Sequence, residues 1–431
     1  MSRQFLVAVV LAIGSASALA APTLVGFASL PADSLVAGPT SGQFIDPPSP
    51  NGRTTPFVDR QPVQGFSSVI PGADGRFLGL SDNGFGAQGN SADALLQVHE
   101  LDIDFRTQAG GSGTVNVVSS TPLSDPNDVI NFPIVAEQAN YPNGAGNIPV
   151  DAAIASGRLL TGADFDQESF RRDANGNFWF GDEFGPFLYK ANAQFELIGT
   201  PIPTPGVQAP QNPFLGGGTP NLPTSRGYEG MAISQDGMIL YPMLEGTVTG
   251  DPAGTLRIAK FDIASEGFTG DQWLYALSDP SHAIGELTQV NDHEFLIIER
   301  DGGQGASAAF KKVFQIDLND IDPSSGTLRK TEILDLLAIA DPFDLNLDSV
   351  LTFDFPFVTI ESILPIDAYT LLIANDNNYP FSIGRGPDID NNEFILVRLD
   401  EPLNLPGAAP VAPTALLLGL GLPLLLRRRS G

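Results

Sequence analysis

The stretch D-F-D-Q-E-S-F-R-R-D-A-N-G-N-F-W-F-G-D-E-F-G-P-F-L-Y-K, residues 164–190, predicts a β-hairpin with carboxylates at one end. Glu168 opens a short strand pattern, residues 173–176 are typical of a tight turn, and a second strand runs over residues 178–183. The first residue of one antiparallel strand lies beside the last residue of its partner. We therefore expect Glu168 and Glu183 to be close neighbours at the open end of the hairpin.

Similar hairpin patterns recur along the chain, which indicates a repeat architecture. Each copy has an opening residue, a first strand pattern and a second apolar strand that ends in an acid. The opening residues are Ser67, Glu168, Glu229, Glu286 and Glu361. The closing acid falls fifteen positions later at Asp82, Glu183, Asp301 and Asp376, and sixteen positions later at Glu245. This register predicts that the acids of successive hairpins lie at one end of the fold.

Alternating apolar and polar residues after each hairpin predict the outer strands of four-stranded blades. The last copy lacks a fourth strand, and residues 23–28, which also have a strand pattern, are available to fill that place. We therefore predict an all-β fold over residues 21–401, a β-propeller with five countable blades and six possible, whose ring is closed by the N-terminal strand. Radial repetition of this kind protects strand edges.

The composition excludes several classes of function. The 431 residues contain no cysteine, which rules out thiol catalysis and cysteine-based metal sites. The formal net charge of −28 argues against binding nucleic acid or anionic lipid, and it favours the attraction of divalent cations. Because no disulfide can cross-link the fold, bound cations are a natural substitute.

Both ends of the chain carry targeting patterns. Residues 1–20 have a positive start, an apolar run and an A-x-A site, so they are expected to be a signal peptide for the Sec pathway. Residues 402–431 combine a Pro/Ala linker, the apolar run 415–426 and three arginines at 427–429. Twelve apolar residues are short for a membrane-spanning helix, which needs about twenty.

The C-terminal layout resembles the cleavable PEP-CTERM sorting signals of Gram-negative bacteria, with Pro/Ala residues in place of the Pro-Glu-Pro signature. The alternative is a basic tail that only associates with the inner membrane. In either case we expect only the tail to contact a membrane, and it would hold the protein transiently at the inner membrane. We expect the protein to be periplasmic, at the outer surface or extracellular.

Five blocks of the repeats together resemble the bacterial phytase-like family, described as "esterase-like activity of phytase". The resemblance spans about residues 62–399, and the blocks are residues 160–168, 178–186, 226–232, 295–301 and 373–378. It implies a propeller related in shape to calcium-dependent alkaline phytases, and hydrolysis of phosphoesters or other esters. The chain has few of the basic residues that a phytase would use to hold several phosphates, which argues against phytate as the substrate.

The acids at the hairpin ends are the candidate metal ligands, because in a propeller they converge on one end of the central channel. Oxygen-only ligands of this kind suit Ca²⁺, with Mg²⁺ as the second choice. The alternative is that the acids bind backbone amides of the next blade or face a wet channel. The candidate ligands are Asp82, Glu168, Glu183, Glu229, Glu245, Glu286, Glu299, Asp301, Glu361 and Asp376.

If the protein is an enzyme, metal-assisted attack of water fits the residues best. Glu183 or Glu229 would orient the water, and Arg226 and Arg300 would hold an anionic group of the substrate. The alternative for both arginines is that they neutralise the acid ring. A Ser-His-acid triad is disfavoured, because the chain has no G-x-S-x-G elbow and only three histidines.

Two functions therefore remain open for the exported chain. The first is a metal-dependent hydrolase of a small anionic or ester substrate. The second is a non-catalytic, calcium-stabilised propeller that binds an envelope glycan or protein. In both cases we expect a monomer that does not bind nucleic acid. A propeller fold by itself does not choose between catalysis and binding.

Overall fold

The structure is a computed structural model that describes residues 21–142 and 146–407. The predicted signal peptide and the tail beyond residue 407 lie outside the described residues. Strands dominate the described part, in which α1 (Ala152–Gly157) is a short α-helix. Within these residues no helix is long and apolar enough to cross a membrane. The described residues also include four short 3-10 helices: η1 (Pro50–Gly52), η2 (Gln88–Asn90), η3 (Val135–Glu137) and η4 (Gly305–Ser307).

Antiparallel groups of four strands succeed one another along the chain, each ordered from the centre outward. The first group is β4 (Phe66–Pro71), β5 (Phe77–Ser81), β6 (Gln97–Asp104) and β7 (Thr114–Pro122). The second group is β8 (Gln167–Arg172), β9 (Phe178–Asp182), β10 (Phe187–Ala191) and β11 (Ile202–Pro203). The third group is β12 (Tyr228–Ile233), β13 (Ile239–Leu244), β14 (Thr255–Asp262) and β15 (Gly267–Ala276).

The remaining strands complete the ring and add two small hairpins. The fourth group is β16 (Ala283–Gln289), β17 (Glu294–Arg300), β18 (Lys311–Ile321) and β19 (Leu328–Asp335). The fifth group is β22 (Thr359–Pro365), β23 (Thr370–Asp376), β24 (Asn392–Arg398) and β1 (Thr23–Leu30). The hairpins are β2 (Leu35–Ala37) with β3 (Arg60–Pro62), and β20 (Ile339–Ala340) with β21 (Thr352–Phe353).

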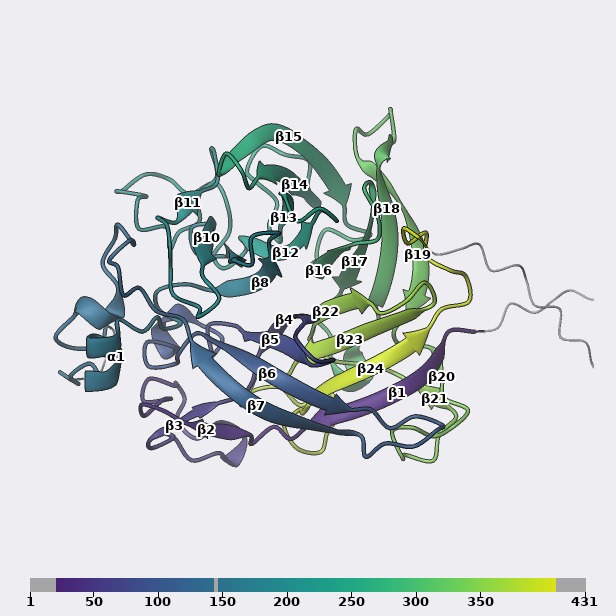
Figure 1. Ribbon diagram of the computed structural model, residues 1–431, viewed down its shortest axis with the longest axis horizontal. Helices are drawn as coiled ribbons and strands as arrows, with labels where there is room; N and C mark the ends of the chain where they lie inside the picture. The colour runs from purple at the N-terminus through teal and green to yellow at the C-terminus, as the bar shows by residue number, and fades with distance from the viewer. Residues whose placement is uncertain (1–20, 143–145, 408–431) are drawn as a thin grey trace, which may run out of the picture.

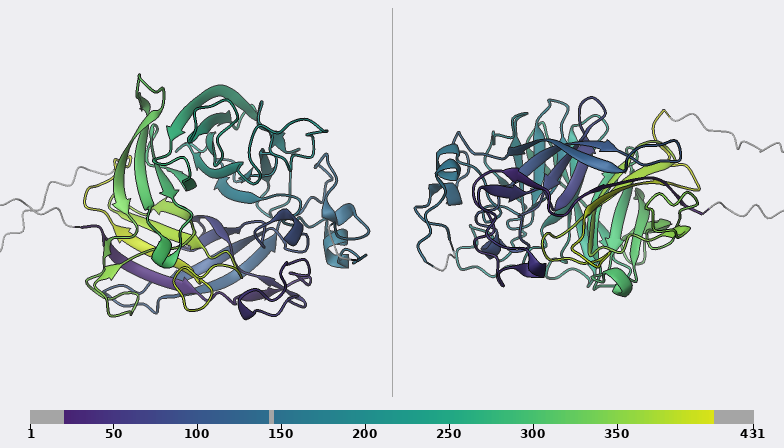
Figure 2. Two further views of the ribbon diagram at one scale, coloured as in Figure 1. Left: turned by 180° about the vertical axis from the view of Figure 1, so that it is seen from behind. Right: turned by 90° about the horizontal axis from the view of Figure 1, so that it is seen from below.

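The groups are arranged around a common centre. Each innermost strand contacts the innermost strand of the next group, in the closed order β4, β8, β12, β16, β22 and back to β4 (Figure 1). Figure 2 shows the same arrangement from behind and from below. The prediction of an all-β propeller is therefore confirmed.

The N-terminal strand closes the ring, as the sequence predicts. β1 pairs antiparallel with β24 from Thr23 opposite Arg398 to Leu30 opposite Asn392. Its other edge meets β7 at Ser29 and Thr114, so the fifth group and the first group share one continuous sheet. The two ends of the propeller domain are thus held together by backbone hydrogen bonds without any disulfide.

Alternation along the strands builds the core between neighbouring sheets. Phe178 and Phe180 of β9 face the first group and pack in one cluster with Leu80, whereas Trp179 faces the third group and packs with Phe261. Trp179 is fully buried, and its indole N–H donates to Asp173 over 3.1 Å. Because both faces of a blade are covered in this way, the sequence F-W-F is apolar throughout.

Candidate metal centre

Each innermost strand carries a β-bulge at the same place, near its start. The pairing register shifts by one residue there in all five hairpins, so one residue in each is left unpaired. A bulge of this kind re-aims the side chain of the extra residue. The bulged residues are Ser67, Glu168, Glu229, Gly285 and Glu361.

The second strand of each hairpin contributes an equivalent residue beside the bulge. The residue before each bulge pairs with Ser81, Asp182, Leu244, Glu299 or Asn375, in chain order. The next residue in each case lies at the open end of the hairpin. These residues are Asp82, Glu183, Glu245, Arg300 and Asp376.

The fourth hairpin therefore lacks the carboxylate that the other four have at the second of these positions and that three of them have at the first. It has Gly285 at the bulge and Arg300 at the strand end. A Cβ atom at residue 285 would lie 1.9 Å from the carbonyl oxygen of Ile360, so the neighbouring inner strand leaves no room for a side chain. The one cation among the five strand-end residues is Arg300.

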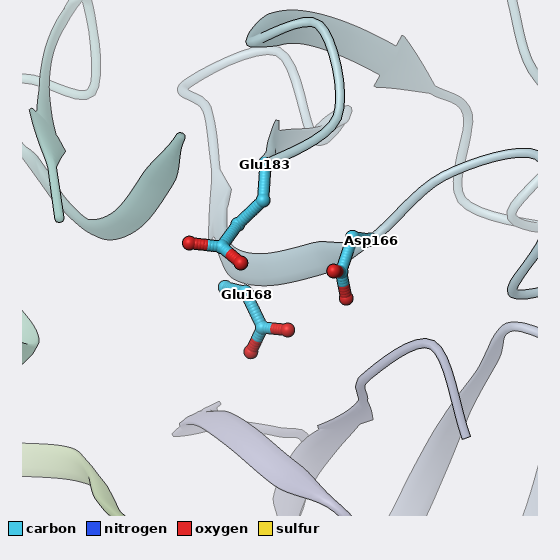
Figure 3. A group of neighbouring side chains, drawn as sticks. All are labelled: Asp166, Glu168 and Glu183. Atoms are coloured by element: carbon cyan, nitrogen blue, oxygen red, sulfur yellow. The ribbon is translucent and has the colours of Figure 1, made fainter. Parts of the chain in front are cut away.

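Eight carboxylates gather at this end of the central channel, and none is more than 9% exposed. Oxygen atoms of Asp166, Glu168 and Glu183 lie within 4.8 Å of one another, and so do those of Glu183, Glu229 and Glu245. Figure 3 shows the first set, with side chains from the start of β8 and the end of β9. We call the eight the acid cluster: Asp82, Asp166, Glu168, Glu183, Glu229, Glu245, Glu361 and Asp376.

Burial and mutual repulsion raise the pKa of most of these groups. Burial, followed by the charges of neighbouring acids, holds the pKa of Glu168, Glu183 and Glu229 well above the ordinary value. The same causes raise the pKa of Glu361 to about 8, although Arg300 opposes the shift. Burial raises the pKa of Asp376 to about 6. A cation at the cluster would relieve this repulsion.

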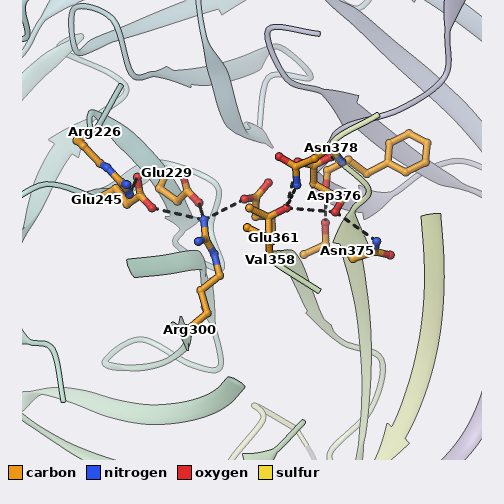
Figure 4. Close-up of polar contacts among 12 residues, drawn as sticks. Arg226, Glu229, Glu245, Arg300, Val358, Glu361, Asn375, Asp376 and Asn378 are labelled. Carbon is orange, nitrogen blue, oxygen red and sulfur yellow. Dashed lines mark hydrogen bonds and ion pairs between the residues drawn. The ribbon is translucent and has the colours of Figure 1, made fainter. Parts of the chain in front are cut away.

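Two arginines contact one side of the acid cluster (Figure 4). The Nη2 atom of Arg300 lies 3.4 Å from Glu229, 3.4 Å from Glu245 and 3.2 Å from Glu361. Arg226 forms an ion pair with Glu245, and its side chain is 45% exposed. Arg300 is buried and already shared among three acids, whereas Arg226 retains access to solvent.

Three of the ten predicted ligands do not join the acid cluster. Glu286 lies further along the channel, where it pairs with Arg171 at 2.8 Å. Glu299 faces the third group and accepts hydrogen bonds from Tyr275 and His282. Asp301 pairs with Lys311 at 2.9 Å. The bulge in the fourth hairpin lies at residue 285, so the predicted acids Glu286 and Asp301 each lie one residue beyond the positions that face the acid cluster.

One acid of the cluster, Asp166, is not among the predicted ligands. Asp166 precedes β8, and two backbone hydrogen bonds tie it to the end of β9. In one, its N–H donates to the Asp182 carboxylate over 3.0 Å. In the other, the N–H of Glu183 donates to the Asp166 carbonyl over 2.9 Å. The available signal was its position two residues before Glu168 in the same D-F-D-Q-E motif.

Fold and site together define a β-propeller with buried carboxylates at its centre. Virginiamycin B lyase from Staphylococcus aureus aligns over 77% of this chain and 79% of its own, with 12% identity and a TM-score of 0.31. A GH43 β-1,3-galactosidase aligns over 78% of this chain and 90% of its own, with 10% identity and a TM-score of 0.37. These comparisons concern architecture alone.

An uncharacterized secreted protein of Arthroderma benhamiae is 26% identical over 200 residues, which are 36% of this chain and 37% of that protein. The chain thus spans little more than a third of that relative. A family model described as "Phytase-like: Esterase-like activity of phytase" matches residues 61–379. The protein belongs to this phytase-like family.

Proposed function

We propose that this protein is an exported hydrolase of phosphoesters or other esters that uses a divalent cation, calcium, at the acid cluster. The observation that carries the proposal is the charge imbalance at the centre of the fold. Eight buried carboxylates are contacted by only two arginines of the described residues. Burying charges without partners is costly, so a group with raised pKa values either binds protons or recruits a cation.

The residues present fit a calcium ion. The oxygen Oε1 of Glu183 is buried, and no donor among the described residues reaches it. This atom belongs to a side chain shared by both sets of close carboxylates. Calcium takes six to eight oxygen ligands in flexible geometry, whereas magnesium requires a near-ideal octahedron. When bound, calcium would polarise a phosphoryl or carbonyl oxygen of the substrate.

The roles of the protein groups follow from their exposure. Arg226 is partly exposed beside the acid cluster, so it is the group we assign to an anionic part of the substrate. Glu229 or Glu183 would orient the attacking water and accept its proton. Burial and the neighbouring acids raise the pKa of both groups, which makes each carboxylate a stronger base and suits this role.

The second candidate function is a non-catalytic, calcium-stabilised propeller that binds a glycan or protein outside the cytoplasm. The observation that favours it is the burial of the acid cluster, since none of its members exceeds 9% exposure. A closed cluster suits a cation that stabilises the fold better than one that meets a substrate. In both versions the chain acts as a monomer in the periplasm, at the outer surface or outside the cell.

The decisive experiment compares hydrolysis by wild type and by two variants, in calcium and in chelator. The variants are Glu183→Gln and, as the control, Glu401→Gln, which changes an exposed acid outside the acid cluster. Substrates are 4-nitrophenyl phosphate, bis(4-nitrophenyl) phosphate, inositol hexakisphosphate and 4-nitrophenyl butyrate. We expect calcium-dependent hydrolysis of at least one of these by wild type and by the Glu401 variant, and its loss in Glu183→Gln. Calcium-dependent melting without hydrolysis would instead support the binding propeller.

A further inference from the structure

Arg300 is the one basic residue among the five equivalent strand-end positions around the channel. In the other four hairpins the same strand-end position is occupied by a carboxylate, at Asp82, Glu183, Glu245 and Asp376. The bulge beside Arg300 has glycine, so the fourth hairpin adds one positive charge and no negative charge to the cluster. Four of the five strand-end positions are therefore acidic, and one is basic.

The guanidinium of Arg300 reaches across the centre rather than outward. Its Nη2 atom lies between 3.2 and 3.4 Å from Glu229, Glu245 and Glu361, which belong to the groups on either side. Its side chain is only 9% exposed. Arg226 adds a second positive charge at Glu245. This half of the acid cluster therefore has counter-charges supplied by the chain.

The other half of the acid cluster has no basic partner among the described residues. Asp166 accepts from the Asn83 side chain over 2.7 Å, and Asp82 accepts from the backbone N–H of Gly84 over 2.8 Å. Among the described residues, no lysine or arginine forms an ion pair with Asp82, Asp166 or Glu168. The unpartnered Oε1 of Glu183 lies between the two halves.

We propose that Arg300 acts as a built-in cation that takes the place of a second metal ion. The chain then binds one divalent cation, at Asp166, Glu168 and Glu183, and none at Glu183, Glu229 and Glu245. This inference rests on the proposed cation site and adds to it which carboxylates hold the ion, how many ions bind and which residue limits that number. A guanidinium in contact with three carboxylates repels a divalent ion from the same oxygens and occupies the space it needs.

The test counts calcium ions bound to the full mature chain by isothermal titration and by elemental analysis after gel filtration. We expect one ion per chain in wild type and two in Arg300→Gln, which removes the charge and leaves an oxygen that can coordinate. Arg300→Lys keeps the charge and is the matched control, with one ion expected. Two ions in wild type, or one in folded Arg300→Gln, would overturn the inference while leaving the cation site in place.

A second pair of variants keeps the test decisive if Arg300→Gln does not fold. Asp166→Asn should lose the ion, whereas Glu229→Gln should retain it, and each variant removes one buried charge of the same sign. The reverse result would refute the assignment of the site. Absence of any bound calcium in wild type would refute the proposed cation site itself, and the inference with it. Circular dichroism establishes that each variant is folded.

Discussion

Removal of calcium should make the stability of this protein fall steeply as the pH rises. Burial raises the pKa of three acids in the cluster above their values in the unfolded chain, to about 8 for Glu361 and about 6 for Asp166 and Asp376. The folded, calcium-free state therefore binds more protons than the unfolded state. The stability that these protonated groups contribute is fully present below about pH 4, close to the unfolded pKa values, and is lost progressively as the pH rises from there to the folded pKa values of about 6 to 8.

Glu361 alone sets the scale of the effect. It is 4% exposed, and a pKa raised from 4.5 to about 8 corresponds to about 5 kcal/mol of stability lost between those pH values. The acids are mutually coupled, so their contributions do not add. For a chain of this size, 5 kcal/mol corresponds to a fall in Tm on the order of 10 °C. Calcium at 100 times its Kd would restore about 2.7 kcal/mol.

The assay is a series of thermal melts between pH 4.5 and 8.5, in chelator and in calcium. The Tm in chelator should fall across this range, and the difference between the calcium and chelator curves should widen. Glu361→Gln removes a titrating group and should flatten the chelator curve, whereas Glu401→Gln should leave it unchanged. A chelator curve that is flat or rising, or a calcium effect of equal size at both ends, would refute the reasoning.

Three further predictions concern single side chains. Replacing Arg226 with Gln should lower kcat/KM roughly tenfold for an anionic phosphoester, through one lost charged hydrogen bond, and leave a neutral ester nearly unaffected; equal losses for both substrates would contradict the assigned role. Replacing the buried Trp179 with Ala should destabilise the fold by about 3–5 kcal/mol, measured by denaturant unfolding; a loss below about 1 kcal/mol would show that the core is not packed as described. Gly285→Ala places a methyl group against the backbone of Ile360 and should lower the free energy of unfolding by about 1–3 kcal/mol in the same measurement. An unchanged unfolding midpoint would mean that the inner strands separate easily.

The architecture was accessible from the sequence because it depends on local and repeated patterns. Apolar alternation, tight turns and a recurring acid register define the strands and their succession, and residues 23–28 have the pattern of the missing strand. The same register identified the carboxylates of the second, third and fifth hairpins, such as Glu168, Glu229 and Glu361. The turn glycine lies at the same distance from the opening residue in the first three copies, at Gly75, Gly176 and Gly237, so the opening residue is placed correctly in each of them.

The composition of the acid cluster was decided by tertiary structure. In the fourth hairpin, a shift of one residue exchanges the side chain that points into the channel for the one that points away. The position of the bulge, at Gly285, therefore selects Arg300 instead of Glu299 or Asp301. The sequence shows an acid on each side of an arginine and has no local signal for which of the three faces the centre.

The two arginines and Asp166 also separate what the sequence determines from what the tertiary structure decides. Arg226 and Arg300 stand in similar acidic blocks, yet one is half exposed and the other is enclosed by acids from two neighbouring groups. Asp166 joins the cluster because backbone hydrogen bonds to the end of β9 hold its loop in place. Residue types and repeats are properties of the chain itself, and they determined which chemistry is available. Which charges share one buried volume depends on contacts between distant segments, and only the folded ring decides that.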